Sequence, residues 1–359
     1  MRLAKLMALR PVVGAGLLVT LTDRCPLSCA HCSVSATRAG RHLDAAALLR
    51  FLRTFTADRR PEVLMLTGGE PLLRPSLVAD AARAAREAGT RTAVLSGAFF
   101  AAAPALPAAV RRAARAVDHF SLSLDAFHER EIPRSDVLRA LEGLLALGVA
   151  TSLHVLAAGP RDTYPDEVAE QVRRRFGDAV PLLVSEVRRV GRGAALPGHP
   201  ARPPLPLAGS AAPCAMAAWP VVASDGTLTA CCEQRAVDGP RRPGHLVLGN
   251  IRETGWPETV ERTAQRPLLR AVRVLGPVET AANSGAPAGP DACGTCHQLG
   301  ARPEAAAWAG RAMGGLVGDL LQSTAVRRLT DAGPAALVAR HGSPRHAHLV
   351  GSEPGAGPR

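Results

Sequence analysis

The 359-residue sequence has no long hydrophobic run, few aromatic residues and a single lysine, Lys5. A membrane-spanning helix needs roughly 18 or more consecutive apolar residues, so the sequence predicts no membrane partner. Aromatic residues make up only 3% of the chain, which leaves few surfaces on which single-stranded nucleic acid could stack. The net charge of +12 comes from arginines scattered along alanine-rich stretches, rather than from a basic stripe. We therefore expect no nucleic-acid partner and a cytoplasmic location.

The eight cysteines avoid the middle of the chain, where about 180 residues contain none. Three of them, Cys25, Cys29 and Cys32, lie within eight positions, and the other five fall between residues 214 and 296. A disulfide framework is typical of short secreted chains. Two clusters in a chain of this length predict two separate metal sites.

Six apolar, β-like runs alternate with segments of helical period between residues 16 and 187. The runs cover residues 16–22, 62–67, 91–96, 118–124, 149–156 and 180–187. Repeated βα units at this spacing predict an α/β fold around a parallel sheet. Six units suit a partial (β/α)6 TIM-like barrel, with a doubly wound sheet as the competing architecture. Periodicity alone does not separate the two.

Composition divides the chain into five predicted segments. A Pro/Gly-rich stretch is typical of a linker. The cysteine-bearing segment after it contains short strand-like pieces. The end of the chain is predicted to be disordered from about residue 341. The segments are an N-terminal lead-in (1–15), the α/β core (16–190), the linker (191–213), a small cysteine-rich α+β domain (214–298), and a C-terminal helix with its tail (299–359).

The cysteine motif Cys25-x3-Cys29-x2-Cys32 follows the first predicted strand. In a barrel-like parallel sheet, loops that follow strands gather at the face where active sites lie. Structural zinc usually closes all four ligand positions with paired C-x2-C motifs. A four-iron cluster held by three thiolates instead leaves one iron open to bind another ligand.

This spacing, with His31 before the third cysteine, resembles the radical S-adenosylmethionine superfamily. The second predicted strand is followed by Gly68, Gly69, Glu70 and Pro71, which are similar to the family's GGEP motif. The resemblance implies a 4Fe-4S cluster whose open iron binds S-adenosylmethionine, with the methionine amino group held at residues 68–71. It also implies reductive cleavage to a 5′-deoxyadenosyl radical, which abstracts a hydrogen atom from the substrate.

Other positions match the family less closely. Ser96 lies where relatives commonly carry Thr-Asn-Gly and is assigned to the cofactor site. Ser123 and Asp125 resemble the family's Ser-x-Asp motif, which implies that they face the carboxylate and ribose of S-adenosylmethionine. His128 and Glu129 on the next turn are candidate catalytic residues, although a solvated loop is the competing interpretation.

The C-terminal cysteines resemble an auxiliary-cluster extension of the SPASM type, or its shorter twitch form. The pattern is Cys214-x11-Gly226-x4-Cys231, followed by Cys293-x2-Cys296. Four cysteines suffice for one auxiliary 4Fe-4S cluster, and Cys232 either replaces Cys231 or is a spare thiol. A zinc site formed by the same four residues is the alternative.

The predicted function is therefore a radical S-adenosylmethionine oxidoreductase or maturase that needs an electron donor such as flavodoxin or ferredoxin. Its main predicted substrate is a small molecule, such as a sugar or aminocyclitol, in natural-product biosynthesis. The alternative is a ribosomally synthesised peptide, which would need recognition by the barrel or by a separate protein because only about fifteen residues precede the first strand. A hypothesis of another class is a non-catalytic iron–sulfur or zinc protein.

Overall fold

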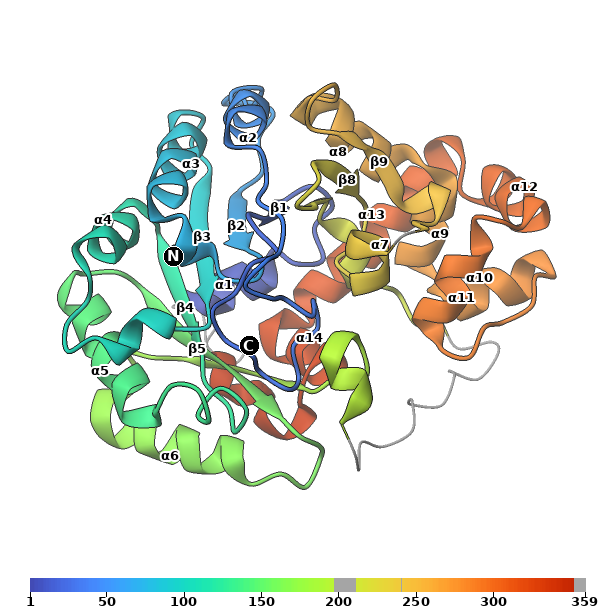
Figure 1. Ribbon diagram of the computed structural model, residues 1–359. Helices are drawn as coiled ribbons and strands as arrows, with labels where there is room; N and C mark the ends of the chain where they lie inside the picture. Colours follow the sequence, from blue (N-terminus) through green and yellow to red (C-terminus); the bar gives the residue numbers. More distant parts are fainter. Residues whose placement is uncertain (197–210, 240, 352–359) are drawn as a thin grey trace.

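The computed structural model describes residues 1–196, 211–239 and 241–351, and within them nine strands form one sheet (Figure 1). Six of the strands coincide with the predicted apolar runs, which confirms that part of the sequence analysis. The strands are β1 Gly16–Thr20, β2 Val63–Thr67, β3 Arg91–Ser96, β4 His119–Ser123, β5 Thr151–Ala157, β6 Leu182–Glu186, β7 Val221–Val222, β8 Thr227–Thr229 and β9 Val247–Asn250.

Helices connect the strands, as the helical periodicity predicts. Local signals position some of them: the Asp44 side chain caps α2 by accepting from the Ala47 amide, and Pro75 starts α3 at a position where its missing N–H costs nothing. The helices are α1 Leu3–Ala8, α2 Ala45–Leu52, α3 Pro75–Glu87, α4 Ala108–Ala116, α5 Arg134–Ala146, α6 Tyr164–Phe176, α7 Gln234–Asp238, α8 Trp256–Gln265, α9 Pro267–Val274, α10 Pro277–Ser284, α11 Ala292–Leu299, α12 Pro303–Ala312, α13 Gly315–Asp331 and α14 Gly333–His341.

The order of the strands decides between the two architectures. Strands β1 to β6 lie side by side in chain order, and each pairs in parallel with the next. A doubly wound sheet contains a point at which the strand order reverses, and these six strands have none. Strand β6 lies at an edge of the sheet, so the barrel is partial and open, as the family resemblance implies.

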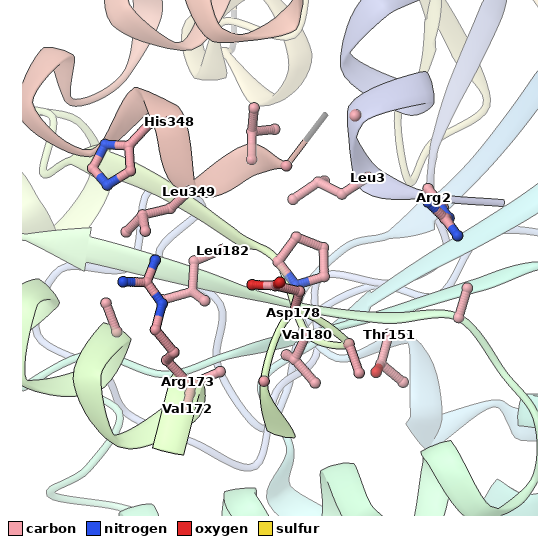
Figure 2. Close-up of a pocket in the computed structure, with 18 of the residues that line it drawn as sticks. Arg2, Leu3, Thr151, Val172, Arg173, Asp178, Val180, Leu182, His348 and Leu349 are labelled. Carbon is pink, nitrogen blue, oxygen red and sulfur yellow. The ribbon is translucent and has the colours of Figure 1, made fainter. Parts of the chain in front are cut away.

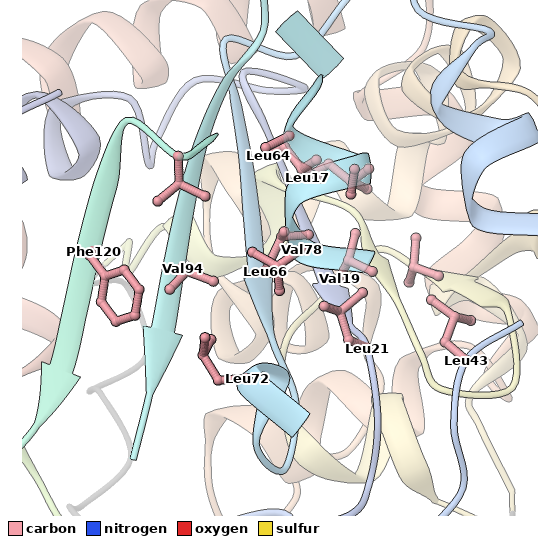
Figure 3. Packing of buried hydrophobic residues seen from close by; sticks show 14 of the residues in the cluster. Leu17, Val19, Leu21, Leu43, Leu64, Leu66, Leu72, Val78, Val94 and Phe120 are labelled. Carbon is pink, nitrogen blue, oxygen red and sulfur yellow. The ribbon is translucent and has the colours of Figure 1, made fainter. Parts of the chain in front are cut away.

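Alternate side chains along each strand pack against opposite layers. On one face, Leu64 and Leu66 join a large core with the helices, together with Val78 of α3 (Figure 3). On the other face, Val63 packs with Leu6 of α1 and with Trp219. Each fully buried large apolar side chain contributes about 1.5–3 kcal/mol, so both faces of the sheet stabilise the fold. The predicted N-terminal lead-in thus contains a helix, α1, that packs against the face of the sheet opposite α3.

The cysteine-bearing segment continues the same sheet. Strand β7 pairs in parallel with β1, with Leu18 opposite Val221, and β8 and β9 extend the sheet in antiparallel fashion. Helices α8 to α12 gather on this side of the molecule, away from α4 to α6 (Figure 1). The sequence predicts a separate small domain here. The shared sheet instead places β7, which lies between Cys214 and Cys231 in the chain, next to the strand that leads into the N-terminal cysteine motif.

The end of the chain differs from its prediction. A 3₁₀ helix, η6 Pro344–Val350, follows α14, and its Val350 and Ala347 form a buried cluster with Leu3 and Val338. His346 also lies 3.0 Å from Asp166. Disorder from residue 341 is therefore wrong for residues 341–351, because these apolar side chains cover the end of α1. Residues 352–359 and most of the predicted linker, 197–210, lie outside the described residues.

Candidate functional site

The three N-terminal cysteines lie on the loop that follows β1. Cys29 is buried, while Cys25 and Cys32 are partly exposed, and none of the eight cysteines of the chain forms a disulfide. The Cys32 amide donates to the Cys29 carbonyl at 3.2 Å, and the Cys25 amide donates to Thr37 at 2.9 Å. Backbone bonds within one loop therefore hold all three thiols.

Arg192, just after β6, fixes this loop from the opposite edge of the core sheet. Its guanidinium donates to the Cys29 carbonyl at 3.0 Å and to the Ala36 carbonyl at 2.6 Å. Its own amide donates to the Cys32 carbonyl at 2.9 Å. Arg192 was not among the predicted site residues, because nothing in the sequence shows that residues 163 positions apart meet.

The GGEP loop after β2 docks directly on the cysteine loop. The Gly69 amide donates to the Thr22 carbonyl at 2.6 Å, and the Glu70 amide donates to the Arg24 carbonyl at 2.8 Å. A Cβ atom on Gly69 would lie 2.2 Å from the Arg24 oxygen. The two loops can approach this closely only because position 69 has no side chain.

The Glu70 side chain is fully buried and already has protein partners. Its carboxylate accepts from the Leu72 amide at 2.8 Å, the Gly97 amide at 2.9 Å and the Ser96 hydroxyl at 2.9 and 3.0 Å. These donors act to lower the pKa of Glu70, but burial has the larger effect and raises it to about 7. The assignment of Glu70 and Ser96 to the cofactor site stays a prediction. Their hydrogen bonds join the ends of β2 and β3.

Asp125 and His128 form a second buried pair, after β4. Asp125 Oδ1 accepts from the amides of Phe127 and His128, and Oδ2 lies 2.7 Å from His128 Nδ1. His31 of the cysteine loop reaches the same carboxylate, with Nε2 at 3.7 Å. Burial acts to raise the pKa of Asp125, but its hydrogen bonds to His128 and the charges of the two histidines outweigh burial. The pKa of Asp125 is therefore lowered.

The ligand atoms of His31, Asp125 and His128 lie within 4.8 Å of one another. Protein donors contact both oxygens of Asp125, and its predicted contact with S-adenosylmethionine stays a prediction. His31 Nδ1 is buried without a hydrogen-bond partner among the described residues.

The remaining predicted residues lie apart from these contacts. Glu129 accepts from the Tyr164 hydroxyl at 2.6 Å and pairs with Arg134 at 3.0 Å. These contacts join the loop after β4 to the first residues of α5 and α6. Ser123 is partly exposed at the end of β4, and its assignment stays a prediction. A catalytic role for His128 or Glu129 likewise stays a prediction.

The three-thiol loop fits a metal cluster by its donor chemistry. Burial raises the pKa of Cys25 to about 12, so a cation is needed to hold this sulfur as a thiolate near neutral pH. Thiolates are the ligands of iron–sulfur clusters, and this loop supplies three of them. Cys25, Cys29 and Cys32 would therefore hold the cluster, leaving one iron for a non-protein ligand.

A second group of cysteines forms around β8 and α11. The pKa of Cys231 is raised by burial and then by the charges of Cys232, Cys214 and Cys296, and Cys293 acts on Cys296 in the same way. Cys296 is buried and the other cysteines of the group are partly exposed. Crowded thiols of this kind fit a cationic cluster or zinc.

Three basic side chains reach the sulfurs of this second group, and none of them was among the predicted site residues. Arg10 donates to Cys232 Sγ at 3.3 Å and Arg188 to Cys293 Sγ at 3.8 Å. His245 Nε2 lies 3.9 Å from Cys296 Sγ.

A cavity of about 760 Å³ lies at the other end of the core (Figure 2). Thr151 and Leu182, the first residues of β5 and β6, line it together with Arg173 and His348. The cysteine loop follows the carboxyl end of β1, and parallel strands bring their carboxyl ends to the same edge. This cavity therefore does not belong to the cysteine site.

Comparison with known proteins agrees with this geometry. Residues 19–172 match the family model described as "Radical SAM superfamily". The chain is 29% identical over 185 residues to a "PqqA peptide cyclase" of Gluconobacter oxydans, covering 51% of the chain and 48% of that protein. It is 31% identical over 174 residues to a protein of the same name from Methylocella silvestris, covering 47% of the chain and 44% of that protein. The chain thus spans about half the length of the curated relatives it matches.

Among solved structures, the fold is similar to that of Streptococcus suis SuiB bound to S-adenosylmethionine. The TM-score is 0.50 at 12% identity, with 74% of this chain and 68% of that chain covered. Within the described residues, no helix has the length and apolar character needed to cross a membrane.

Proposed function

The chain carries a radical S-adenosylmethionine domain over residues 19–172, and on this premise we propose that it is a maturase that modifies a peptide through radical chemistry. The observation that carries the proposal is the docking of two loops. The Gly69 and Glu70 amides bind the backbone of the loop that holds Cys25, Cys29 and Cys32. A non-catalytic metal protein requires the thiols but gives no reason for a GGEP loop seated beside them.

When bound, the cluster and S-adenosylmethionine supply an electron and a 5′-deoxyadenosyl group that can remove a hydrogen atom from the substrate. The residues of this chain bind and orient these groups. Cys25, Cys29 and Cys32 would ligate the cluster, and the backbone of residues 68–71 would receive the methionine amino group. Glu70 and Ser96 belong to the proposed cofactor site, and the hydrogen bonds between them hold the ends of β2 and β3 together.

A peptide substrate is favoured over a small molecule. Both curated relatives described above carry the name peptide cyclase, whereas the small-molecule hypothesis is supported only by the presence of a single auxiliary site. Cyclisation joins two positions of one peptide and removes two hydrogen atoms in total. One leaves with the deoxyadenosyl group, and the other leaves as a proton and an electron.

The second cysteine group gives that electron a destination. Cys214, Cys231, Cys293 and Cys296 would hold a twitch-type auxiliary cluster that accepts it. A donor such as flavodoxin or ferredoxin would supply the first electron, and a separate peptide-recognition protein belongs to the same proposal.

The test is anaerobic reconstitution with iron and sulfide, followed by reduction in the presence of S-adenosylmethionine. We expect about eight irons per chain, since two four-iron clusters are proposed, and release of 5′-deoxyadenosine. Cys25→Ala should abolish this release, whereas Cys214→Ala should remove the auxiliary iron and leave some cleavage. Tight zinc binding without nucleoside release would instead establish the non-catalytic hypothesis.

Substrate class is tested separately, with synthetic peptides that correspond to short reading frames beside the gene. Loss of two hydrogen atoms from such a peptide, dependent on Cys25 and on Cys214, supports the maturase. Turnover of an aminocyclitol with no change in any peptide would reject the peptide substrate.

A further inference from the structure

We propose that the cavity of about 760 Å³ between α6, η6 and the first residues of β5 and β6 binds an amphipathic monocarboxylate. The ligand would place its carboxylate on Arg173, its apolar body in the middle of the cavity and a second polar oxygen on Thr151. The site lies at the opposite end of the core strands from the three-cysteine loop and needs no metal cluster. It is therefore independent of the proposed function.

The size and walls of the cavity fit a small molecule with an apolar body. Small-molecule sites usually enclose about 300–1,000 Å³ and combine apolar walls with a few polar groups. The apolar walls come from α1, α6, β6 and η6, segments that are distant in the sequence (Figure 2). The buried residues that form them are Leu3, Val172, Val180, Leu182 and Val350. A ligand here would contact all four segments at once.

Arg173 is the basic group best placed to bind the carboxylate. It is the first of three consecutive arginines in the last turn of α6. Arg174 pairs with Glu170 at 3.0 Å, and Arg175 pairs with Glu142 at 2.7 Å. Of the three, only Arg173 lines the cavity, and it has no ion-pair partner within residues 1–196, 211–239 and 241–351. Its guanidinium can therefore bind a ligand without breaking a bond inside the described protein.

The charges around the cavity favour a ligand with a single negative charge. Arg2 and Arg173 supply two guanidinium groups, Asp178 supplies one carboxylate, and His348 is the remaining titratable side chain of the lining. With His348 neutral, the lining has one net positive charge. A guanidinium binds a carboxylate through two parallel hydrogen bonds, whereas Asp178 would repel a second carboxylate. These charges therefore fit a monocarboxylate.

Thr151 provides the second polar contact. This residue is 2% exposed, and its Oγ1 has no hydrogen-bond partner in the part of the chain that the structure describes. A buried hydroxyl without a partner destabilises a protein, and a ligand oxygen would supply the missing bond. In Figure 2, Thr151 lies on the side of Arg2, away from Arg173. A carboxylate on Arg173 therefore leaves Thr151 to the other end of the ligand.

The test is isothermal titration calorimetry of the full, reconstituted chain with decanoate, 10-hydroxydecanoate and decanol, each below the concentration at which it forms micelles. We expect decanoate to bind at one site per chain. Decanol, which lacks the charge, should bind roughly tenfold more weakly, and 10-hydroxydecanoate should bind roughly fivefold more tightly because of the added hydrogen bond.

Matched variants locate the site. Arg173→Gln should weaken decanoate binding roughly tenfold and leave decanol binding unchanged, whereas Arg174→Gln on the same helix should alter neither. Thr151→Val keeps the shape of the side chain and should abolish the preference for 10-hydroxydecanoate over decanoate. Its control is Thr92→Val, because Thr92 is also buried with no partner for Oγ1 among the described residues but does not line the cavity.

Hydrogen exchange gives a readout of where the ligand sits. Decanoate should slow exchange at the amides of η6, since a ligand that contacts both η6 and β6 opposes their separation. The proposal is overturned if decanoate does not bind, if it binds at many equivalent sites, or if Arg173→Gln and Arg174→Gln weaken binding equally. A preference for 10-hydroxydecanoate that survives in Thr151→Val would show that Thr151 does not contact the ligand.

Discussion

The contact between the GGEP loop and the cysteine loop predicts that Gly69→Ala disables the site. The new Cβ atom would lie 2.2 Å from the Arg24 oxygen and 2.6 Å from its carbonyl carbon. Both are backbone atoms, which cannot turn aside as a flexible side chain can. Real Cβ contacts of this kind exceed 3.0 Å, so one loop must move away from the other by nearly an ångström.

The cost follows from the bonds that this movement breaks. The Gly69 amide bond to Thr22 and the Glu70 amide bond to Arg24 are the two backbone links between the loops. Each is worth about 1 kcal/mol, and the forced overpacking adds about 1–3 kcal/mol. We therefore expect the free energy of unfolding to fall by about 3–5 kcal/mol, a large part of the 5–15 kcal/mol typical of a folded protein.

Denaturant unfolding under anaerobic conditions measures this loss, and iron analysis of the reconstituted protein measures the effect on the site. The matched control is Gly159→Ala, because a Cβ atom on Gly159, which follows β5, would have no neighbour within 4 Å. Gly69→Ala should lose the three-cysteine cluster and retain the auxiliary one. Equal stability and equal iron content in the two variants would refute the argument that close loop contact requires glycine at position 69.

Three further predictions concern other parts of the molecule. Burial lowers the pKa of His119 from 6.5 to about 4, so the folded state disfavours its proton and stability is lost as the pH falls from about 6.5 toward 4. His119→Gln should remove about 3 kcal/mol of this loss, and a variant with an unchanged pH profile of unfolding would contradict the assignment. Cys231→Ala should remove the auxiliary iron and Cys232→Ala should not, because Cys231 packs in the same core as Cys214 and Cys296 whereas Cys232 lies in another cluster; iron analysis showing the reverse would exchange the two roles. Arg192→Gln should speed the release of iron to a chelator from the three-cysteine site alone, since it loses bonds to the Cys29 and Ala36 carbonyls; equal release rates would show that the loop does not need this anchor.

Much of the fold could be predicted because its signals are local. Apolar runs and helical periodicity reflect which residues each strand and helix must bury, and all six core strands occur where the sequence predicts them. Strand order could not be derived from periodicity, because a run of apolar residues does not specify its neighbour. The sequence also did not predict that residues 341–351 are folded, because Ala347 and Val350 become buried only when they pack against Leu3.

For the candidate site, the sequence alone determined which residues carry metal-binding chemistry, because thiols at short spacing in one loop need no other part of the chain to be close together. It also identified the GGEP loop, whose place after the second strand follows from the βα pattern. Only the tertiary structure decided what the other side chains do. Glu70, Ser96 and Asp125 match cofactor-binding positions in the sequence, and that assignment stays a prediction. The structure adds that Glu70 bonds to Ser96 and Gly97 at the end of the next strand, whereas Asp125 bonds to His128 of its own loop. The physical reason is burial: a polar group removed from water must find a partner inside the protein, and which partner it finds depends on segments that are distant in the chain and adjacent only after folding.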